Sequence, residues 1–173
     1  MRRTLSFLLL CAALAGCRLL PEPVPLVVGE ATPAMTAGLR RGFTLLRAGR
    51  AGPAAGVATG LLAEHPWWVE AHRLLQLARR EEGRSGPLLN RYLALSRENP
   101  GRPEAWYLRG RIGHPPARQE RCFRRALALN PRFARAWGGL AVVALERGEP
   151  AAARRCLERA RELAPREADY PLA

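Results

Sequence analysis

The chain has 173 residues, which is enough for one domain, and a formal net charge of +13. All of its basic residues are arginine, and they are spread along the chain rather than gathered in blocks. No basic motif interleaved with aromatic residues is present, so the composition disfavours a nucleic-acid-binding module. Two interpretations of the charge stay open, namely a solvated surface and an attraction to anionic lipid or acidic partners.

The N-terminus has the pattern of an export signal. Arg2 and Arg3 are followed by an uncharged stretch over residues 4–16, and Cys17 comes directly after it. The apolar part is shorter than the ~20 residues that a membrane-spanning helix needs. A basic start, a short apolar core and small residues before a cleavage site predict a secretory signal peptide over residues 1–16.

The end of this signal carries a more specific motif. Leu14-Ala15-Gly16-Cys17 resembles the lipobox of bacterial lipoproteins. The resemblance implies cleavage after Gly16, attachment of acyl chains such as palmitate to Cys17, and a lipid anchor. Arg18 stands where, in that family, an Asp retains the protein at the inner membrane, so the resemblance implies the periplasmic side of the outer membrane. The alternative is an ordinary signal peptide in which Cys17 is incidental.

A proline-rich stretch follows over residues 17–34. Pro21, Pro23, Pro25 and Pro33 interrupt any helical pattern there. Such stretches favour extended polyproline geometry and act as semi-rigid spacers. We therefore expect a tether between the lipidated end and a folded domain.

The remainder of the chain repeats one helical unit. In residues 133–165, apolar and small residues recur three and four apart on two successive stretches, which predicts two amphipathic helices. Gly148 suits a left-handed cap at the end of the first helix, and Pro150 suits the first turn of the second. The residues that carry the pattern are Trp137, Leu140, Ala141, Ala144, Ala153, Leu157, Ala160 and Pro165.

This unit resembles the tetratricopeptide repeat. Helix-ending prolines at Pro66, Pro100, Pro131 and Pro165 lie 34, 31 and 34 residues apart. The resemblance implies an all-α fold, a right-handed superhelical solenoid of about four helix-turn-helix repeats. Their expected bounds are about 35–66, 69–100, 103–131 and 134–165, with a C-terminal tail over residues 166–173.

Three of the units depart from the family pattern. Gly38 and His72 stand where Trp is preferred, and the third unit is three residues short around Pro115 and Pro116. Prolines cannot lie inside a helix, so we expect a short first helix and a local break in the superhelix at that point.

No catalytic set is visible, and we predict that the chain is not an enzyme, with no metal or other cofactor. Asp169 is the single aspartate, and the three histidines are His65, His72 and His114. Neither a paired-carboxylate site nor a Ser-His-Asp site has its parts. His72 lies at a core-type position, where a hydrogen-bonded core histidine is a better interpretation than a metal ligand.

The resemblance implies a binding groove on the concave face of the first helices. The groove would be apolar with several arginines and would suit a peptide or helix that carries acidic groups; the alternative is an ordinary solvated surface. Leu39, Glu104 and Arg135 fall on the same set of positions as the groove residues themselves. Those residues are Phe43, Leu46, Arg73, Leu77, Arg80, Tyr107, Arg111, Val142 and Leu145.

Two further pairs of residues have open interpretations. Of the adjacent Trp67 and Trp68, one is expected to pack at the start of the next helix, and the other is either structural or an exposed anchor for a partner. Cys122 and Cys156 occupy equivalent places in neighbouring units. Helices packed 8–10 Å apart exceed the ~7 Å Cα separation that a disulfide allows, so two reduced thiols are favoured over a bridge.

The combined features predict a membrane-anchored periplasmic adaptor that binds another envelope protein through its groove, with no nucleic acid or small-molecule substrate. The layout is similar to that of the tetratricopeptide lipoproteins that assist type IV or Flp/Tad pilus assembly. Two alternatives are a recruiter of peptidoglycan enzymes and a surface binder of anionic polymer.

Overall fold

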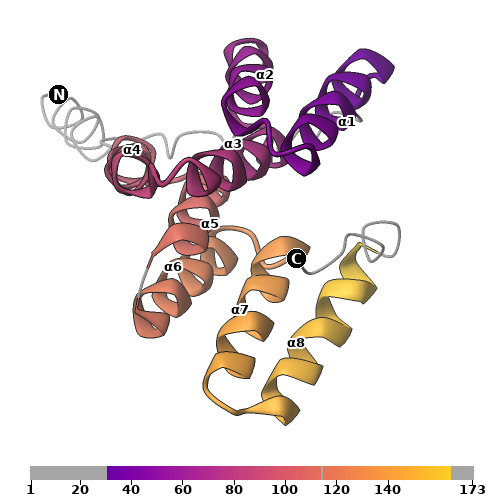
Figure 1. Cartoon of the computed structure of the whole chain (residues 1–173). Coiled ribbons are helices and arrows are strands. Elements are labelled where there is room, and N and C mark those ends of the chain that lie inside the picture. Colours follow the sequence, from indigo (N-terminus) through magenta and orange to yellow (C-terminus); the bar gives the residue numbers. More distant parts are fainter. Residues whose placement is uncertain (1–30, 114, 165–173) are drawn as a thin grey trace, which may run out of the picture. The chain divides into compact units, whose positions relative to one another are not determined.

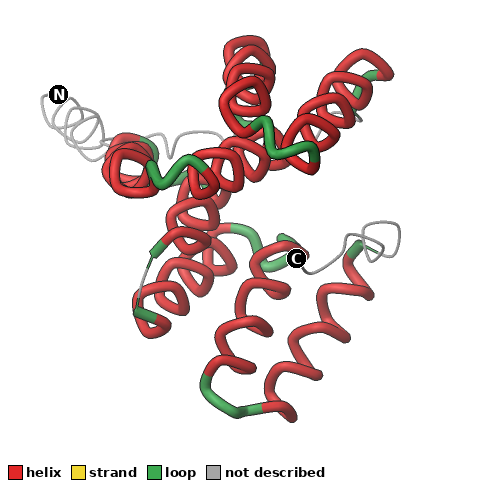
Figure 2. The backbone as a smooth tube through the Cα atoms, in the orientation of Figure 1, coloured by secondary structure: helices red, strands yellow, loops and turns green. Residues whose placement is uncertain are grey.

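The computed structural model describes residues 31–113 and 115–164, and every regular element in these ranges is an α-helix. The predicted signal peptide, Cys17, the tether up to residue 30 and the tail from residue 165 lie outside the described residues. Eight helices occupy the described part of the chain, and Figures 1 and 2 show them joined by short loops. They are α1 (Pro33–Arg47), α2 (Ala51–Glu64), α3 (Val69–Glu81), α4 (Ser85–Glu98), α5 (Pro103–Ile112), α6 (Pro116–Leu129), α7 (Ala134–Glu146) and α8 (Pro150–Leu163).

The helices form four successive hairpins, α1–α2, α3–α4, α5–α6 and α7–α8. The turns of the first, second and fourth hairpins contain Gly49, Gly83 and Gly148, whose φ angles are 72°, 70° and 74°. Only glycine adopts this left-handed conformation without a steric cost, so it ends the first helix of each of these three pairs. The predicted roles of Gly148 as a cap and of Pro150 in the first turn of α8 are confirmed.

The third hairpin turns by a different device. Its first helix, α5, has 10 residues, against 13 to 15 in α1, α3 and α7. Gly113 has a φ of −83°, and α6 begins with Pro116 at its first turn. The predicted short first helix is confirmed. The backbones of α5 and α6 nevertheless approach each other closely at many points, and α6 packs against α7.

The core is built around positions where one helix has no side chain. A Cβ atom at Gly110 of α5 would lie 2.6 Å from Cε1 of Phe123 on α6, and one at Gly139 of α7 would lie 2.7 Å from Cζ of the same ring. Phe123 therefore lies in a slot formed by two glycine backbones. Gly42 of α1 has the same role beneath Leu74, whose Cδ2 would overlap with a Cβ atom at position 42. Close approach of the helices depends on these three glycines.

The second hairpin is more open than the others. The backbones of α3 and α4 approach each other closely at few points, whereas those of α1 and α2, α5 and α6, and α7 and α8 run close together. In Figure 1, α4 is seen nearly end-on beside α3, while α7 and α8 lie side by side. Gln76 of α3 and Gly110 of α5 occupy equivalent positions, each ten residues after the proline that closes the preceding repeat. The larger side chain keeps the two helices apart.

An aromatic ring joins each of the last three hairpins to the proline that precedes it. Trp106 and Trp137 each donate from Nε1 to the carbonyl oxygen of the proline six residues earlier, Pro100 and Pro131, at 2.9 and 3.0 Å. Nε2 of His72 lies 2.8 Å from the carbonyl oxygen of Pro66. A carbonyl can only accept, so Nε2 carries the proton and His72 reproduces the hydrogen bond of the tryptophans.

Candidate functional site

The first helices of the hairpins contact one another in order, α1 with α3, α3 with α5, and α5 with α7. The predicted groove residues all belong to these four helices, and we call the surface that they share the first-helix face. The residues on it differ widely in exposure. Some are part of the core, some are paired with each other, and some are free to meet a partner.

The middle of this face contains an internal ion pair. Arg135 of α7 reaches Glu70 of α3, with 2.8 Å between Nη2 and Oε1, and both side chains are largely buried. Glu104 of α5 occupies the same place in its own repeat and is also buried, and its Oε2 has no hydrogen-bond partner among the described residues. The first-helix face therefore has a charged centre, not only the apolar surface with scattered arginines that the sequence predicts.

Tyr107 is in the core rather than at the surface. Its side chain is only 6% exposed, and its ring lies 5.3 Å from that of Phe133 and 5.8 Å from that of Phe123, centroid to centroid. Its hydroxyl oxygen accepts a hydrogen bond from Nη1 of Arg111 at 3.4 Å, and the Arg111 guanidinium lies 6.0 Å from the ring centroid. Tyr107 thus positions Arg111 and offers a partner little surface of its own.

Arg111 also forms a hydrogen bond with a residue of α3. Its Nε donates to Oε1 of Gln76 at 2.8 Å, and Nε2 of Gln76 donates to the carbonyl oxygen of Leu108 at 3.3 Å. These bonds join α3 to α5 across 35 and 32 residues of sequence. The guanidinium of Arg111 is half-buried and fixed in position, as a recognition group for a carboxylate needs to be.

A buried polar chain continues from Gln76 into the second hairpin. The hydroxyl oxygen of Tyr92 lies 3.0 Å from Nδ1 of His72. Tyr92 also forms a side-chain hydrogen bond with Gln76. Since Nε2 of His72 carries the proton, Nδ1 accepts from the Tyr92 hydroxyl. His72 is 2% exposed, so the prediction of a hydrogen-bonded core histidine is confirmed.

Burial changes the ionisation of both rings. The pKa of His72 is lowered to about 4, mainly by burial; the hydrogen bond to Pro66 opposes this shift, and the positive charge of Arg91 adds to it. Burial also raises the pKa of Tyr92 to about 12. Both groups are neutral at pH 7, which suits a structural hydrogen bond and not proton transfer.

The C-terminal part of the face is the most open. Val142 and Leu145 of α7 are 41% and 54% exposed, and they are the large apolar residues that stand out at the surface of the described chain. Arg80 of α3 is exposed too, whereas Arg73 and Leu77 are half-buried. Leu145 also borders a cavity of about 370 Å³ whose other lining residues come from the start and length of α8: Pro150, Ala153, Arg154, Leu157, Glu158 and Arg161.

The N-terminal part of the face is apolar and less exposed. Leu39, Phe43 and Leu46 of α1 are half-buried and pack against the core. These side chains stabilise the first hairpin, which has Gly38 where the later hairpins have an aromatic ring. Only their outer edges are available to a partner.

The paired residues of the sequence have distinct environments. Trp68 packs against the core at the start of α3, while the ring of Trp67 lies 4.4 Å from the guanidinium carbon of Arg102. Cys122 is a buried free thiol and Cys156 a half-buried one, as the favoured interpretation predicts. Burial raises the pKa of each thiol, so neither is activated as a nucleophile.

The described residues show no group of three or more His, Cys, Asp or Glu side chains that could hold a metal ion. None of the described helices combines the length and the apolar character that crossing a membrane requires.

Comparison with known proteins assigns the fold. Residues 121–171 match the family model described as the tetratricopeptide repeat. A thermophilic tetratricopeptide repeat protein of Thermus thermophilus superposes with a TM-score of 0.54 at 22% identity, over 75% of this chain and 74% of that one. The described helices form a tetratricopeptide repeat fold.

Two other solved structures superpose with lower TM-scores. A tetratricopeptide repeat protein of Parabacteroides merdae is 26% identical, with a TM-score of 0.49 over 80% of this chain and 56% of its own. MamA of Desulfovibrio magneticus is 17% identical, with a TM-score of 0.47 over 81% of this chain and 79% of its own. The chain has no significant match among curated proteins.

Two residues of the site, Glu70 and Gln76, are not among those that the sequence predicts. Glu70 has the same place in the second unit as Glu104 and Arg135 have in the third and fourth, so repeat position alone could have found it. Gln76 falls where the family pattern has a small residue, and its role comes from its hydrogen bonds with Arg111, Leu108 and Tyr92.

Proposed function

We propose that this chain is a membrane-anchored periplasmic adaptor that binds another envelope protein through its first-helix face. The observation that carries the proposal is the exposure of the apolar pair Val142 and Leu145 on α7. The repeat pattern assigns both residues to the face by which tetratricopeptide folds bind peptides. Exposed apolar residues beside charged ones favour an amphipathic partner. Arg80 and Arg111, on the same set of helices, would meet its acidic side chains.

Capture of the partner tests this surface. Full-length chain in solubilised envelope membranes should retain a partner that is lost when Val142→Glu and Leu145→Glu are combined, because two buried carboxylates would oppose the apolar contact. Ala94→Glu with Ala128→Glu is the matched control, since it adds the same charge at exposed positions on second helices. Equal capture by both pairs would count against the first-helix face.

The anchor is proposed from the Leu14–Cys17 motif and the proline-rich stretch after it. Lipid on Cys17 would fix the chain to the outer membrane, and the tether would allow the helical domain to reach a partner. Cys17→Ala should abolish palmitate labelling and leave the precursor uncleaved. Labelling that persists in this variant would contradict the anchor and leave the adaptor proposal standing.

Within the envelope we propose pilus biogenesis, with help to a secretin, as the setting. The support is the layout of lipid motif, tether and repeats, which is similar to that of type IV and Flp/Tad assembly lipoproteins. Mass spectrometry of the captured complex distinguishes this role from recruitment of peptidoglycan enzymes, because the first predicts a secretin or pilin component and the second a murein hydrolase or synthase.

The net charge of +13 supports a second candidate, binding of an anionic surface polymer. Binding of this kind depends on screened charges, so it should weaken steeply as salt is added. Capture of a protein that survives high salt would favour the adaptor.

A further inference from the structure

A second cavity lies away from the first-helix face. It has a volume of about 450 Å³ and lies between α2, α3 and α4, and none of its lining residues belongs to the predicted groove. Three of the seven lining residues are arginines, and none is acidic. They are Thr59, Leu75, Arg79, Arg84, Pro87, Leu88 and Arg91.

The cavity exists because the second hairpin is open. Gln76, His72 and Tyr92 lie in the contact between α3 and α4, and the two backbones approach each other closely at few points. Leu75 of α3 and Leu88 of α4 are both buried and form the apolar walls of the cavity. In the hairpin α5–α6, where Gly110 admits Phe123, the helices close together instead.

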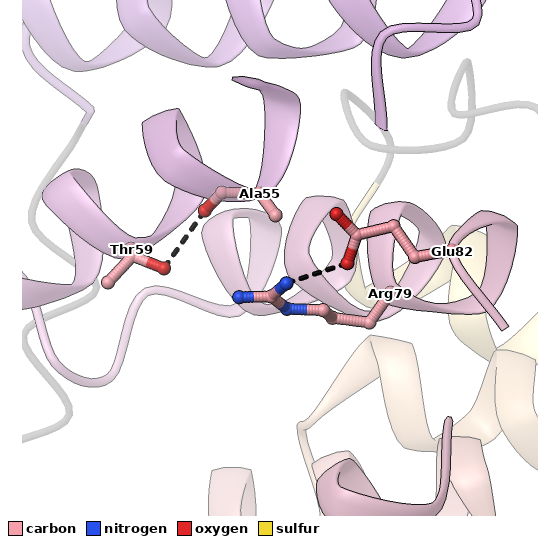
Figure 3. Close-up of polar contacts among 4 residues, drawn as sticks. All are labelled: Ala55, Thr59, Arg79 and Glu82. Carbon is pink, nitrogen blue, oxygen red and sulfur yellow. Dashed lines mark hydrogen bonds and ion pairs between the residues drawn. The ribbon is translucent and has the colours of Figure 1, made fainter. Parts of the chain in front are cut away.

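The arginines give the cavity a net positive charge. Arg79 is paired with Glu82, with 2.6 Å between Nη1 and Oε2, as Figure 3 shows, and Thr59 lies on the neighbouring helix with its hydroxyl donating to the carbonyl oxygen of Ala55. Arg84 and Arg91 are exposed and form no ion pair with an acid of the described chain. Three guanidinium groups and one carboxylate leave two positive charges.

Two features of the backbone and core add to this potential. The first turn of α4 lines the cavity, and its N-cap residue, Arg84, makes no side-chain hydrogen bond to the helix. The N–H groups at the start of a helix carry partial positive charge, although Pro87, which has no N–H, does not contribute to it. Arg91 acts as a positive charge on the nearby core, since it lowers the pKa of both His72 and Tyr92.

We propose that this cavity binds a phosphate group, as free phosphate or as the monoester of a small organic molecule or lipid headgroup. A phosphomonoester carries about two negative charges at neutral pH, which matches the charge of the site. Guanidinium groups bind phosphate oxygens through pairs of parallel hydrogen bonds. Leu75, Leu88 and Pro87 would contact the apolar part of an ester.

Calorimetric titration of the full-length chain in a neutral detergent tests the site at fixed ionic strength. The probes are inorganic phosphate, butyl phosphate, and detergent micelles that contain phosphatidic acid. Arg84→Gln combined with Arg91→Gln should weaken phosphate binding by at least about tenfold, since each charge-assisted contact is worth that much. The control is Arg97→Gln with Arg121→Gln, an equal change of charge at exposed positions outside the cavity.

The result expected is loss of binding in the cavity variant and a change below about twofold in the control. Equal losses in the two variants would show a general charge effect and overturn the proposal, and so would the absence of binding of all three probes up to about 10 mM. Tighter binding of butyl phosphate than of micelles would identify a soluble monoester as the ligand, and the reverse order a lipid headgroup; each result supports the phosphate site.

Discussion

The second and third hairpins join two helices by different chemistry at the same repeat positions. In the third, Gly110 leaves the backbone of α5 open to the ring of Phe123 on α6, and a Cβ there would come within 2.6 Å of that ring. In the second, Gln76 takes the place of Gly110 and Tyr92 that of Phe123, counted from the closing prolines. The helices α5 and α6 pack closely because Gly110 has no side chain, whereas α3 and α4 are joined by hydrogen bonds between polar side chains.

The difference shows what a repeat can tolerate. A large polar residue between two helices is stable when its groups are hydrogen-bonded, and His72, Tyr92 and Gln76 satisfy one another and the backbone. Two consequences follow for the second hairpin. Its stability becomes dependent on pH, and the separation of α3 from α4 leaves room for an arginine-lined cavity.

The largest effect that we expect is the dependence of the second hairpin on pH. The pKa of His72 is about 4 in the folded chain, against 6.5 when unfolded. Above pH 6.5 both states are neutral; as the pH falls toward 4 only the unfolded chain takes up the proton, so the folded state loses stability. The loss is about 1.4 kcal/mol per pH unit and about 3 kcal/mol in all.

Urea denaturation at pH 7 and at pH 4 measures this loss. Carboxylates also titrate in this range, so the comparison is with a variant that copies the third hairpin, His72→Trp with Tyr92→Phe. The variant should lose about 3 kcal/mol less than the natural chain between the two pH values. Equal losses would mean that His72 is not the group responsible, whatever the stability of the variant at pH 7.

A smaller effect is expected from closing the slot of the third hairpin. Gly110→Ala places a methyl group against the buried Phe123, and we expect overpacking of about 3 kcal/mol to exceed the gain in helix propensity of about 1 kcal/mol. Gly138→Ala on α7 is the control, because no atom lies within 4 Å of its Cβ position. It should be neutral or stabilising. Thermal unfolding of both variants decides whether α5 and α6 depend on Gly110.

The sequence predicts the fold through features that repeat. Proline spacing, glycine at the turns and apolar periodicity are local signals, and they place Gly148, Pro150 and the short α5 correctly. Contacts between repeats are not local. The pairs Gln76–Arg111 and Glu70–Arg135 join residues of different helices, and no pattern within one helix specifies them.

The same limit explains the position of Tyr107. Its position within the repeat places Tyr107 on the first-helix face. Because Gly110 and Gly139 have no side chains, the ring of Phe123 fits against their backbones, and Tyr107 packs on that ring. Phe133, at the start of the next hairpin, covers it from another side. The position of a residue within the repeat predicts the helix face on which it lies, but the neighbouring side chains determine how exposed it is.

The smallest effect concerns the ring that joins each hairpin to the preceding proline. Trp106→Phe removes a partly solvated hydrogen bond to Pro100 and should lower the free energy of unfolding by about 1 kcal/mol. His72→Phe also leaves the buried hydroxyl of Tyr92 without its acceptor, so it should lower the free energy of unfolding by about 1 kcal/mol more. Trp68→Phe is the control for loss of ring size, since Trp68 packs against the core without a hydrogen bond from its ring nitrogen to a described residue. Denaturation midpoints that rank His72→Phe no lower than Trp106→Phe would contradict the polar chain, because burial is what makes the lost partner of Tyr92 costly.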